Sequence, residues 1–396
     1  MKILLPVAII FFGQFSAVNS AFAQTWIQAT NAPNRGWSGI ASSSDGVKLV
    51  AVDYEDGGIY ASTNSGVTWT PLTNAPVANW ETIASSADGN VIVAGSAYGF
   101  IYTSTDSGIT WMSNSVPNFW VSVAISGDGS KLAAVDFYDA LIYNSTNSGV
   151  SWTSNAIPNS NNSSSFGFAR AVCCSADGTM LVVGTLGGTI FTSTNSGVDW
   201  TATDVPIADW SSVAYSADGI KLAAACGGGG IYTSINSGSS WTLQTNAPNE
   251  NWYSIASSVD GSKLVAVAGG FVGMKPGPIY TSSDFGVTWT SNIAPDTFWY
   301  SVNSSADGCK KAAVVNGGGI YIWQYSPVLS VALCGGNVVV SWPTNAVNFV
   351  LQQNCDLTTT NWVTLTNTPT LNLTNLQDQV ILSPTNSSSF FRLISQ

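Results

Sequence analysis

An eight-residue phrase that recurs six times is the feature that most limits what this chain can fold into. It reads S-T-N-S-G-V-T-W at Ser62–Trp69 and S-T-D-S-G-I-T-W at Ser104–Trp111, and later copies end at Trp152, Trp200, Trp241 and Trp289. A second phrase, W-x-S-I-A-S-S-x-D-G-x-K-L-V-A-V followed by G-I-Y-T-S, precedes each copy. A unit that contains both phrases and recurs along the chain is typical of architectures in which each unit packs against its neighbours.

Each unit has the pattern of four short strands. K-L-V-A-V is a buried run and I-Y-T-S alternates between apolar and polar residues. An Asp-Gly pair predicts a hairpin turn between strands one and two, because Gly accepts a positive φ. It occurs at Asp45, Asp88, Asp128, Asp177, Asp218, Asp260 and Asp307. The eight-residue phrase predicts a second turn, in which Asp or Asn accepts an N–H two residues on. Four strands per unit predict a β-propeller blade.

The eight-residue phrase resembles the Asp-box of sialidase-like (BNR) propellers and of propellers of the photosystem-assembly-factor type. The copy at Ser104–Trp111 fits S-x-D-x-G-x-T-W at every fixed position. Four of the six copies carry Asn where the resemblance implies Asp, and Asn cannot act as an acid. We therefore expect a structural role for the box positions, which are Asn64, Asp106, Asn147, Asn195, Asn236 and Asp284.

Seven Asp-Gly turns but only six boxes predict seven blades, the last of which is incomplete. The final unit ends at Gly319–Trp323 without a fourth strand of its own. Residues Thr25–Pro33 match Thr68–Pro76 and are an unassigned fourth strand near the N-terminus. We expect an all-β fold, a seven-bladed propeller over residues 24–326, closed by this N-terminal strand so that no sheet edge stays free.

The first 23 residues have the pattern of a signal peptide. Lys2 is followed by the apolar run Ile3–Phe12 and by an A-x-A cleavage site at Ala21–Ala23. We expect cleavage near Ala23 and a secreted, periplasmic or cell-surface protein, with a retained N-terminal anchor as the alternative. No later stretch of 18 apolar residues occurs, so no membrane span is predicted.

Residues 328–396 lack the blade phrases and predict a small β-sandwich. Their runs G-G-N-V-V-V-S-W-P, F-V-L-Q-Q-N-C-D-L and F-F-R-L resemble a fibronectin-III-like module of secreted bacterial proteins. The resemblance implies attachment, sorting or carbohydrate binding. Cys334 and Cys355 flank strands of this domain and are predicted to form a disulfide. The other cysteines, Cys173, Cys174, Cys226 and Cys309, are expected to be buried fillers or free thiols.

Composition excludes several function classes. The chain has no His, which removes Ser-His-Asp and Cys-His catalysis and His-ligated metals. Its net charge of −11 disfavours nucleic acid as a partner. Only Arg35 and Arg170 lie in the propeller, short of the three arginines that a sialidase resemblance implies, so sialidase activity is excluded. We expect no metal and no cofactor, and a monomer.

Ligands are expected on the propeller face that carries the loops before strand one and after strand two, because these loops vary most. Drift in unused loops is the alternative explanation. We expect non-catalytic recognition of an extracellular glycan or protein. A polysaccharide-active hydrolase or lyase is the alternative, and it needs two carboxylates about 5–9.5 Å apart. Glu81 and Asp53, from adjacent blades, are the candidate pair unless both are solvated surface acids.

Blade four departs from the repeat at its first strand. Ala169 stands where the other blades have Trp, with Phe168 before it and Arg170 after it. We expect a notch in which Arg170 holds an acidic sugar or a carboxylate; alternatively, Phe168 fills the lost Trp volume and Arg170 pairs with a nearby Asp. The candidate ligand-binding residues are Phe168, Arg170, Trp120, Tyr138, Asp139 and Trp210. The Trp side chains either stack on sugars or form core between blades.

Overall fold

The computed structural model of the chain describes residues 8–9, 25–114, 116–138, 141–157, 168–270, 273–324, 329–334, 337–343, 349–355, 361–372, 377–383 and 389–395. The chain divides into two compact units. One unit is Trp26–Gln324, and the other combines Met1–Thr25 with Tyr325–Gln396. No helix long and apolar enough to cross a bilayer occurs in the described part of the chain.

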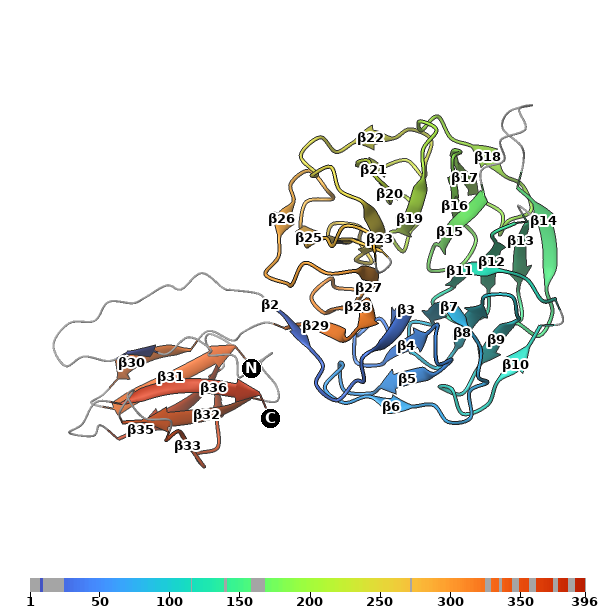
Figure 1. Cartoon of the computed structure of the whole chain (residues 1–396). Helices are drawn as coiled ribbons and strands as arrows, with labels where there is room; N and C mark the ends of the chain where they lie inside the picture. The colour runs from blue at the N-terminus through green and yellow to red at the C-terminus, as the bar shows by residue number, and fades with distance from the viewer. Residues whose placement is uncertain are drawn as a thin grey trace. The chain divides into compact units, whose positions relative to one another are not determined.

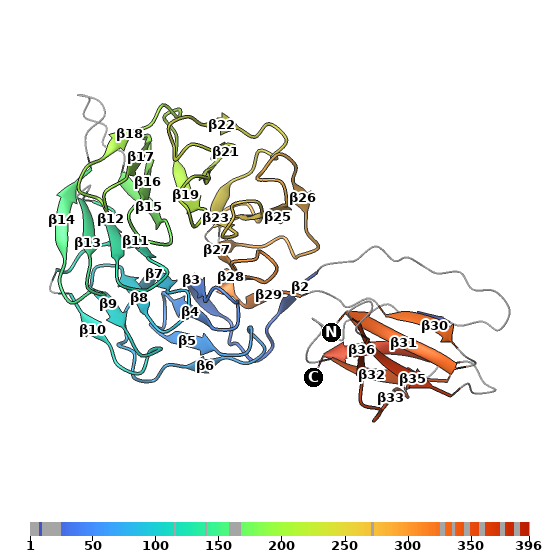
Figure 2. The same cartoon turned by 180° about the vertical axis from the view of Figure 1, so that it is seen from behind.

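The first unit is a ring of antiparallel four-stranded blades (Figures 1 and 2), of which the first and the last also pair with each other in one continuous sheet. Blade one comprises β3 (Arg35–Ser42), β4 (Leu49–Asp53), β5 (Ile59–Ser62) and β6 (Thr70–Pro71). Blade two comprises β7 (Trp80–Ser85), β8 (Ile92–Ser96), β9 (Ile101–Ser104) and β10 (Met112–Ser113). Blade three comprises β11 (Trp120–Ile125), β12 (Leu132–Asp136), β13 (Leu141–Ser145) and β14 (Thr153–Ala156).

The colours of Figure 1 follow the remaining blades around the ring from green to orange. Blade four comprises β15 (Phe168–Cys174), β16 (Leu181–Leu186), β17 (Ile190–Ser193) and β18 (Thr201–Ala202). Blade five comprises β19 (Trp210–Tyr215), β20 (Leu222–Cys226), β21 (Ile231–Ser234) and β22 (Thr242–Leu243). Blade six comprises β23 (Trp252–Ser257), β24 (Leu264–Ala268), β25 (Ile279–Ser282) and β26 (Thr290–Ser291).

Blade seven is completed from the other end of the chain. Its own strands are β27 (Trp299–Ser304), β28 (Lys311–Gly318) and β29 (Ile320–Gln324), and its outermost strand is β2 (Thr25–Gln28). The predicted closure by the N-terminal strand is therefore confirmed, and so is the seven-bladed propeller.

The Asp-Gly turn is held by the same contacts in every blade. In blade one the Ser43 hydroxyl donates to Asp45 Oδ1 at 2.6 Å, and the Val47 N–H donates to the same oxygen at 2.9 Å. Gly46 follows with a φ of 66°, a conformation that Gly adopts without strain. The turns thus form as predicted, and they lie on the face opposite the variable loops; we call these faces the turn face and the loop face.

The turn in the eight-residue phrase differs from its prediction in one contact. Asn64 Oδ1 accepts the N–H of Thr68, four residues on rather than two, at 2.9 Å. Asp106 accepts from Thr110 in the same way at 2.8 Å, and its pKa is lowered to about 2 by the Thr110 hydrogen bonds. Two residues within this span, Ser65 at a φ of 58° and Gly66 at 85°, have the left-handed conformation. These side chains are engaged within their own turns.

A closed ring of seven backbone hydrogen bonds surrounds the propeller axis on the turn face. The residue before each turn aspartate donates its N–H to the carbonyl of the equivalent residue in the next blade. The series begins with Ser44 to Ala87 at 2.8 Å and ends with Ala306 back to Ser44 at 2.8 Å. The other members are Gly127, Ala176, Ala217 and Val259. Each blade is therefore tied to both of its neighbours at its innermost turn.

The second unit is a β-sandwich of two four-stranded sheets. One sheet has the order β1 (Ala8–Ile9), β36 (Phe390–Ser395), β32 (Phe349–Asn354) and β33 (Val363–Thr364). The other has the order β30 (Ser330–Cys334), β31 (Asn337–Pro343), β35 (Gln377–Leu382) and β34 (Thr370–Asn372). Trp342 of one sheet and Phe391 of the other belong to their shared core.

One cysteine prediction is not met in this unit. Cys355 is a free, exposed thiol, so the predicted disulfide with Cys334 is not formed. Cys334 ends β30 and Cys355 follows β32, which belong to different sheets.

Candidate functional site

Five aromatic side chains from three blades lie in contact on the loop face. We call them the aromatic cluster: Tyr98, Phe119, Phe137, Tyr138 and Phe168. Tyr98 follows β8, Phe119 precedes β11, Phe137 and Tyr138 follow β12, and Phe168 begins β15. The cluster therefore spans blades two, three and four, which the repeat brings side by side.

The ring contacts make the aromatic cluster continuous. The ring of Phe119 lies 4.7 Å from that of Tyr98 and 5.7 Å from that of Tyr138, centroid to centroid. Phe137 and Phe168 are stacked at 5.0 Å, and the Tyr98 and Tyr138 hydroxyls are 3.4 Å apart. Tyr98, Tyr138 and Phe168 are 70%, 55% and 42% exposed. An exposed group of aromatic rings of this kind marks an interaction surface.

Tyr98 is held in a strained backbone conformation. Its φ is 54°, and the other described non-glycine residues with positive φ lie in the turns of the eight-residue phrase. Tyr98 lies two residues after Ser96, which pairs with Trp80. The same register places Gly187, Gly228 and Gly317 at this position in blades four, five and seven, with φ of 65°, 71° and 72°. A left-handed L-residue costs about 1–2 kcal/mol. Blade two therefore places an exposed tyrosine where glycine is the low-energy choice.

Asp136 fixes the loops that carry the aromatic cluster. Its carboxylate is fully buried and accepts the N–H groups of Phe119 at 3.1 Å and Tyr138 at 3.0 Å. Asp53 has the equivalent role in blade one, where it accepts the Glu55 N–H at 3.0 Å. Both acids position backbone and are not free to act on a substrate.

A cavity of about 110 Å³ lies on the propeller axis and is lined by the innermost strands of all seven blades. One lining position varies in chemistry from blade to blade. It is the residue directly after the first Trp of each innermost strand, and in blade four it is the residue directly after Ala169. These residues are Ser38, Glu81, Val121, Arg170, Ser211, Tyr253 and Tyr300. We call the cavity the axial cavity.

Four of these residues form a network across the axis. Tyr300 donates to Glu81 Oε1 at 2.7 Å, and Arg170 Nη1 lies 3.6 Å from the same oxygen. Arg170 Nη2 donates to the Tyr253 hydroxyl at 2.8 Å, and the Tyr253 and Tyr300 rings are 4.7 Å apart. Blades two, four, six and seven thus contribute one side chain each.

Burial and charge shift the pKa values of this network. Burial raises the pKa of Glu81, and the opposing effects of Arg170 and the Tyr300 hydrogen bond do not reverse the shift. Burial, followed by the Glu81 charge, raises the pKa of Tyr300 well above 10. Burial alone would lower the pKa of Arg170, but Tyr253, Tyr300 and Glu81 outweigh it and raise the value. Arg170 is therefore a permanent cation inside the cavity.

Each acid of the candidate catalytic pair is engaged by a different cation. Glu81 is 8% exposed and is engaged by Tyr300 and Arg170. Asp53 is fully buried and pairs with Arg35 at 3.1 Å. Neither is a solvated surface acid, and each has its own cation. A carboxylate pair for glycoside chemistry needs two carboxyl groups that face one substrate bond, whereas these two acids are each held by another side chain.

The tryptophan candidates are core residues. Trp120 and Trp210 are fully buried and belong to hydrophobic clusters between blades, so they offer no ring face to a ligand. The alternative role as core is the one found. Trp37, Trp80, Trp252 and Trp299 are likewise 0% exposed.

The alternative explanation for blade four is wrong, and the two residues of the expected notch lie apart. Phe168 does not fill the volume of the missing Trp, because it is 42% exposed and stacks on Phe137. Arg170 pairs with Glu81 and not with an Asp. Phe168 and Arg170 therefore belong to different sites, the aromatic cluster and the axial cavity, and form no joint notch. Asp139 lies outside the described residues.

Tyr253 and Tyr300 are not among the candidate residues that the sequence singled out. The structure turns both toward the axis, where Tyr300 is 6% exposed. The available signal was their register, since both directly follow the first Trp of an innermost strand, as Glu81 does. That position lines the axial cavity in every blade.

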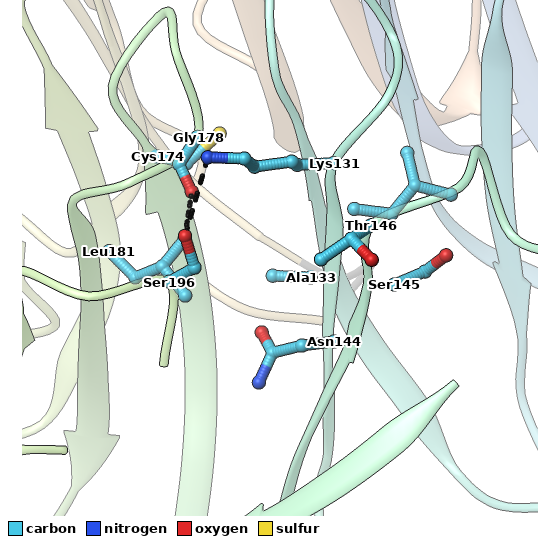
Figure 3. A pocket seen from close by; sticks show the side chains of 10 residues that line it. Lys131, Ala133, Asn144, Ser145, Thr146, Cys174, Gly178, Leu181 and Ser196 are labelled. Carbon is cyan, nitrogen blue, oxygen red and sulfur yellow. Dashed lines mark hydrogen bonds between the residues drawn. The ribbon is translucent and has the colours of Figure 1, made fainter. Parts of the chain in front are cut away.

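A smaller cavity of about 10 Å³ lies between blades three and four (Figure 3). Lys131 reaches across it and donates to the Ser196 hydroxyl at 3.4 Å, which in turn donates to the Gly178 carbonyl. A space of this size holds about one water. Burial raises the pKa of the adjacent Cys174 thiol to about 12, so it is protonated and unreactive. This cavity is a seam between blades.

The remaining cysteines and acids form no metal site in the described part of the chain. Cys173, Cys174, Cys226 and Cys309 are free thiols. No group of three or more His, Cys, Asp or Glu side chains among the described residues is arranged to hold a metal ion.

The sequence matches no family model and no curated protein. Similar solved structures include YCF48 from Cyanidioschyzon merolae, which is 17% identical and is matched over 76% of this chain and 98% of its own, with a TM-score of 0.59. YCF48 bound to D1 peptide is 16% identical over 76% and 96%, with a TM-score of 0.57. The GH74 xyloglucanase from Xanthomonas campestris is 15% identical over 81% of this chain and 59% of its own, with a TM-score of 0.59. At these identities the likeness concerns the fold, and the chain is a β-propeller similar to those of YCF48 and the xyloglucanase.

Proposed function

We propose that this chain is a secreted recognition protein that binds an extracellular glycan or protein through the aromatic cluster, without catalysis. The observation that carries the proposal is the strained backbone of Tyr98. Strain at one exposed residue persists only where the surroundings enforce it, and such residues gather at functional sites. Here the strained backbone holds the Tyr98 ring in solvent, where the ring adds nothing to the packing of the core.

Aromatic faces suit both ligand classes. Tyr and Phe rings bury large areas at low entropic cost, and the Tyr hydroxyls add polar contacts. The similar structures include one with a bound peptide and one of a glycoside hydrolase. Those descriptions apply to their own proteins, but they support a propeller face as a binding surface for either class.

The enzyme alternative has weaker support. A hydrolase or lyase needs a free acid beside a base or nucleophile. Glu81 and Asp53 are each engaged by a different cation, and the aromatic cluster brings no free carboxylate with it among the described residues. We therefore favour binding over catalysis.

The outer parts of the chain fit an exported binder. We infer that residues 1–23 direct export and are cleaved near Ala23, and that residues 24–326 form the recognition domain. Residues 328–396 then serve as a fibronectin-III-like module for attachment or sorting. Without its first 23 residues the sandwich loses the two-residue strand β1 and keeps three strands in that sheet.

A paired variant tests the proposal. The protein is titrated against a panel of soluble polysaccharides and a peptide array, and released reducing ends are assayed in the same samples. The double substitution Tyr138→Ala with Phe168→Ala removes two exposed rings and is expected to weaken binding by roughly 10- to 100-fold.

Ile109→Ala is the matched control, because Ile109 is 63% exposed and lies in a turn-face turn. It is expected to bind as the parent does. Parental affinity in a folded double variant would place the site elsewhere, and product that disappears in Glu81→Gln would establish the enzyme instead.

A further inference from the structure

The axial cavity combines a repeated scaffold with a single varied position. The residue two after each first Trp is Ser or Thr in five blades, and its hydroxyl accepts an N–H from the next blade. Thr82 accepts from Val123 at 3.2 Å, and Ser122 accepts from Val172 at 3.0 Å. Ser212, Ser254 and Ser301 do the same. Five blades thus share this hydroxyl contact, and charge enters the lining only one residue earlier, at Glu81 and Arg170.

This charged pair has hydrogen-bonding capacity left over. A guanidinium has five N–H donors, and the described partners of Arg170 are Tyr253, Tyr300 and Glu81. Both described contacts of the Glu81 carboxylate are made by Oε1. The pair therefore offers at least two N–H donors and the lone pairs of Oε2 to a further ligand.

The structural alternative is that the pair merely ties four blades together. Buried ion pairs are weak stabilisers, and apolar residues of similar volume often do better. The equivalent position is Val121 in blade three, so the scaffold accepts an apolar side chain there. Opposite charges at one varied position of an open polar cavity point instead to a ligand that uses both.

We propose that the axial cavity is a binding site for a small zwitterion, a free α-amino acid of about the size of glycine, alanine or serine. Its carboxylate takes the unused N–H donors of Arg170, and its ammonium group donates to Oε2 of Glu81. In an α-amino acid the ammonium and carboxylate atoms are about 3 Å apart, as the standard bond lengths require. Arg170 Nη1 and Glu81 Oε1 are 3.6 Å apart, so the two charged groups lie close enough together for one small molecule to contact both.

Size and charge both suit such a ligand. The cavity of about 110 Å³ has room for several waters and therefore for a small polar molecule. An isolated anion would meet the Glu81 carboxylate, and an isolated cation would meet Arg170. A zwitterion places each charge beside its opposite.

The test compares ligands that differ by one charge. Glycine, L-alanine and L-serine are titrated calorimetrically into the full chain, beside N-acetyl-L-alanine, which lacks the ammonium group, and L-alanine amide, which lacks the carboxylate. The amino acids are expected to bind saturably, and each analogue is expected to bind roughly 10- to 100-fold more weakly, the factor for one lost charge-assisted hydrogen bond.

The substitution Glu81→Gln is expected to reverse the ligand preference. It removes the negative charge at nearly constant shape, so the preference is expected to move from L-alanine to the anionic N-acetyl-L-alanine. Arg170→Lys keeps the cation but loses the planar fork, and it is expected to weaken L-alanine binding without this reversal. Both variants are first shown to melt as folded proteins.

Tyr98→Gly separates this inference from the proposed function. It alters the aromatic cluster and leaves the axial cavity intact, so amino-acid binding is expected to be unchanged even where glycan or protein binding is lost. The inference is overturned if the parent binds no amino acid saturably, if the single-charge analogues bind as well as L-alanine, or if Glu81→Gln leaves the preference unaltered.

Discussion

Lys311 occupies a position that is apolar in the other six blades. The equivalents are Leu49, Ile92, Leu132, Leu181, Leu222 and Leu264. Lys311 is 9% exposed, donates to the Gly308 carbonyl at 2.7 Å and lies 5.3 Å from the centre of the Trp323 ring. Burial lowers its pKa to about 8. Lys311 therefore has a desolvation penalty that the apolar residues at the equivalent position in the other blades do not have.

Lys311→Leu is expected to stabilise the propeller. The folded pKa lies below the unfolded value of 10.5, so the unfolded chain binds more protons between pH 8 and 10.5 and parental stability rises with pH through that window. At pH 7 the substitution should raise the free energy of unfolding by about 2 kcal/mol, after allowance for the lost hydrogen bond. Urea unfolding at pH 7 and pH 10 measures this, and a gain that does not shrink at pH 10 would contradict the explanation.

Tyr98 lowers the stability of the folded protein in another way, through backbone strain at an exposed residue. Tyr98→Gly relieves a left-handed tyrosine, and the gain is offset in part by the greater freedom of Gly in the unfolded chain. We expect a free energy of unfolding equal to or up to about 1 kcal/mol above that of the parent, together with weaker ligand binding. Thermal unfolding and the ligand titration are run on one preparation, and lower stability would argue that Tyr98 packs structurally.

At the scale of elements, the Asp-Gly turn is the unit that repeats most faithfully. In all seven turns a Ser hydroxyl donates to the Asp carboxylate at 2.5–2.6 Å. These hydrogen bonds stabilise the charged carboxylate and lower its pKa, to about 2 for Asp177 and Asp260. The same small stabilisation is therefore present seven times.

The repeated turn predicts the acid limit of the protein. Because each folded pKa lies below the unfolded value of 3.8, the stabilisation is complete above pH 3.8 and is lost as pH falls toward 2. Melting temperature is expected to drop steeply in that window. In the double variant Asp177→Asn with Asp260→Asn the slope should be shallower, and an unchanged slope would show that other carboxylates control acid unfolding.

Local sequence patterns made the strands and turns predictable. The two candidate sites depend instead on the direction in which particular side chains point, which the local pattern does not give. Asp45 and Gly46 define their turn through contacts within a few residues, so sequence alone suffices. Tyr300 and Glu81 are 219 positions apart and meet only because the ring closes. The register of the innermost strands makes their side chains point toward the axis. This register cannot be read from the residue types themselves. Tyr98 likewise could not be recognised as strained before its φ was known.

At the scale of the whole molecule, closure depends on a short N-terminal strand. Trp26 is 5% exposed, and its ring lies 5.4 Å from that of Trp323 in blade seven. Four residues of β2 therefore cover the edge of β29 and part of the core beneath it.

Deletion of residues 24–30 is expected to expose that edge and core. The melting temperature should fall by many degrees, or the protein should aggregate, because a free edge strand pairs with other chains. Calorimetry and light scattering on the truncated protein measure both effects. Trp26→Phe is the milder companion and should lower stability without aggregation; a truncated chain as stable as the parent would mean that the ring does not need β2.

The closed ring of backbone hydrogen bonds on the turn face has a kinetic consequence. A linear ladder frays from its ends, but a circle of seven donors and seven acceptors has no end at which opening can start. Each amide proton in it, from Ser44 to Ala306, is released only when neighbouring blades separate. These seven amides should therefore exchange with deuterated solvent at one common rate, that of the rarest opening of the propeller, and a single fast member would mark the seam where the circle first breaks.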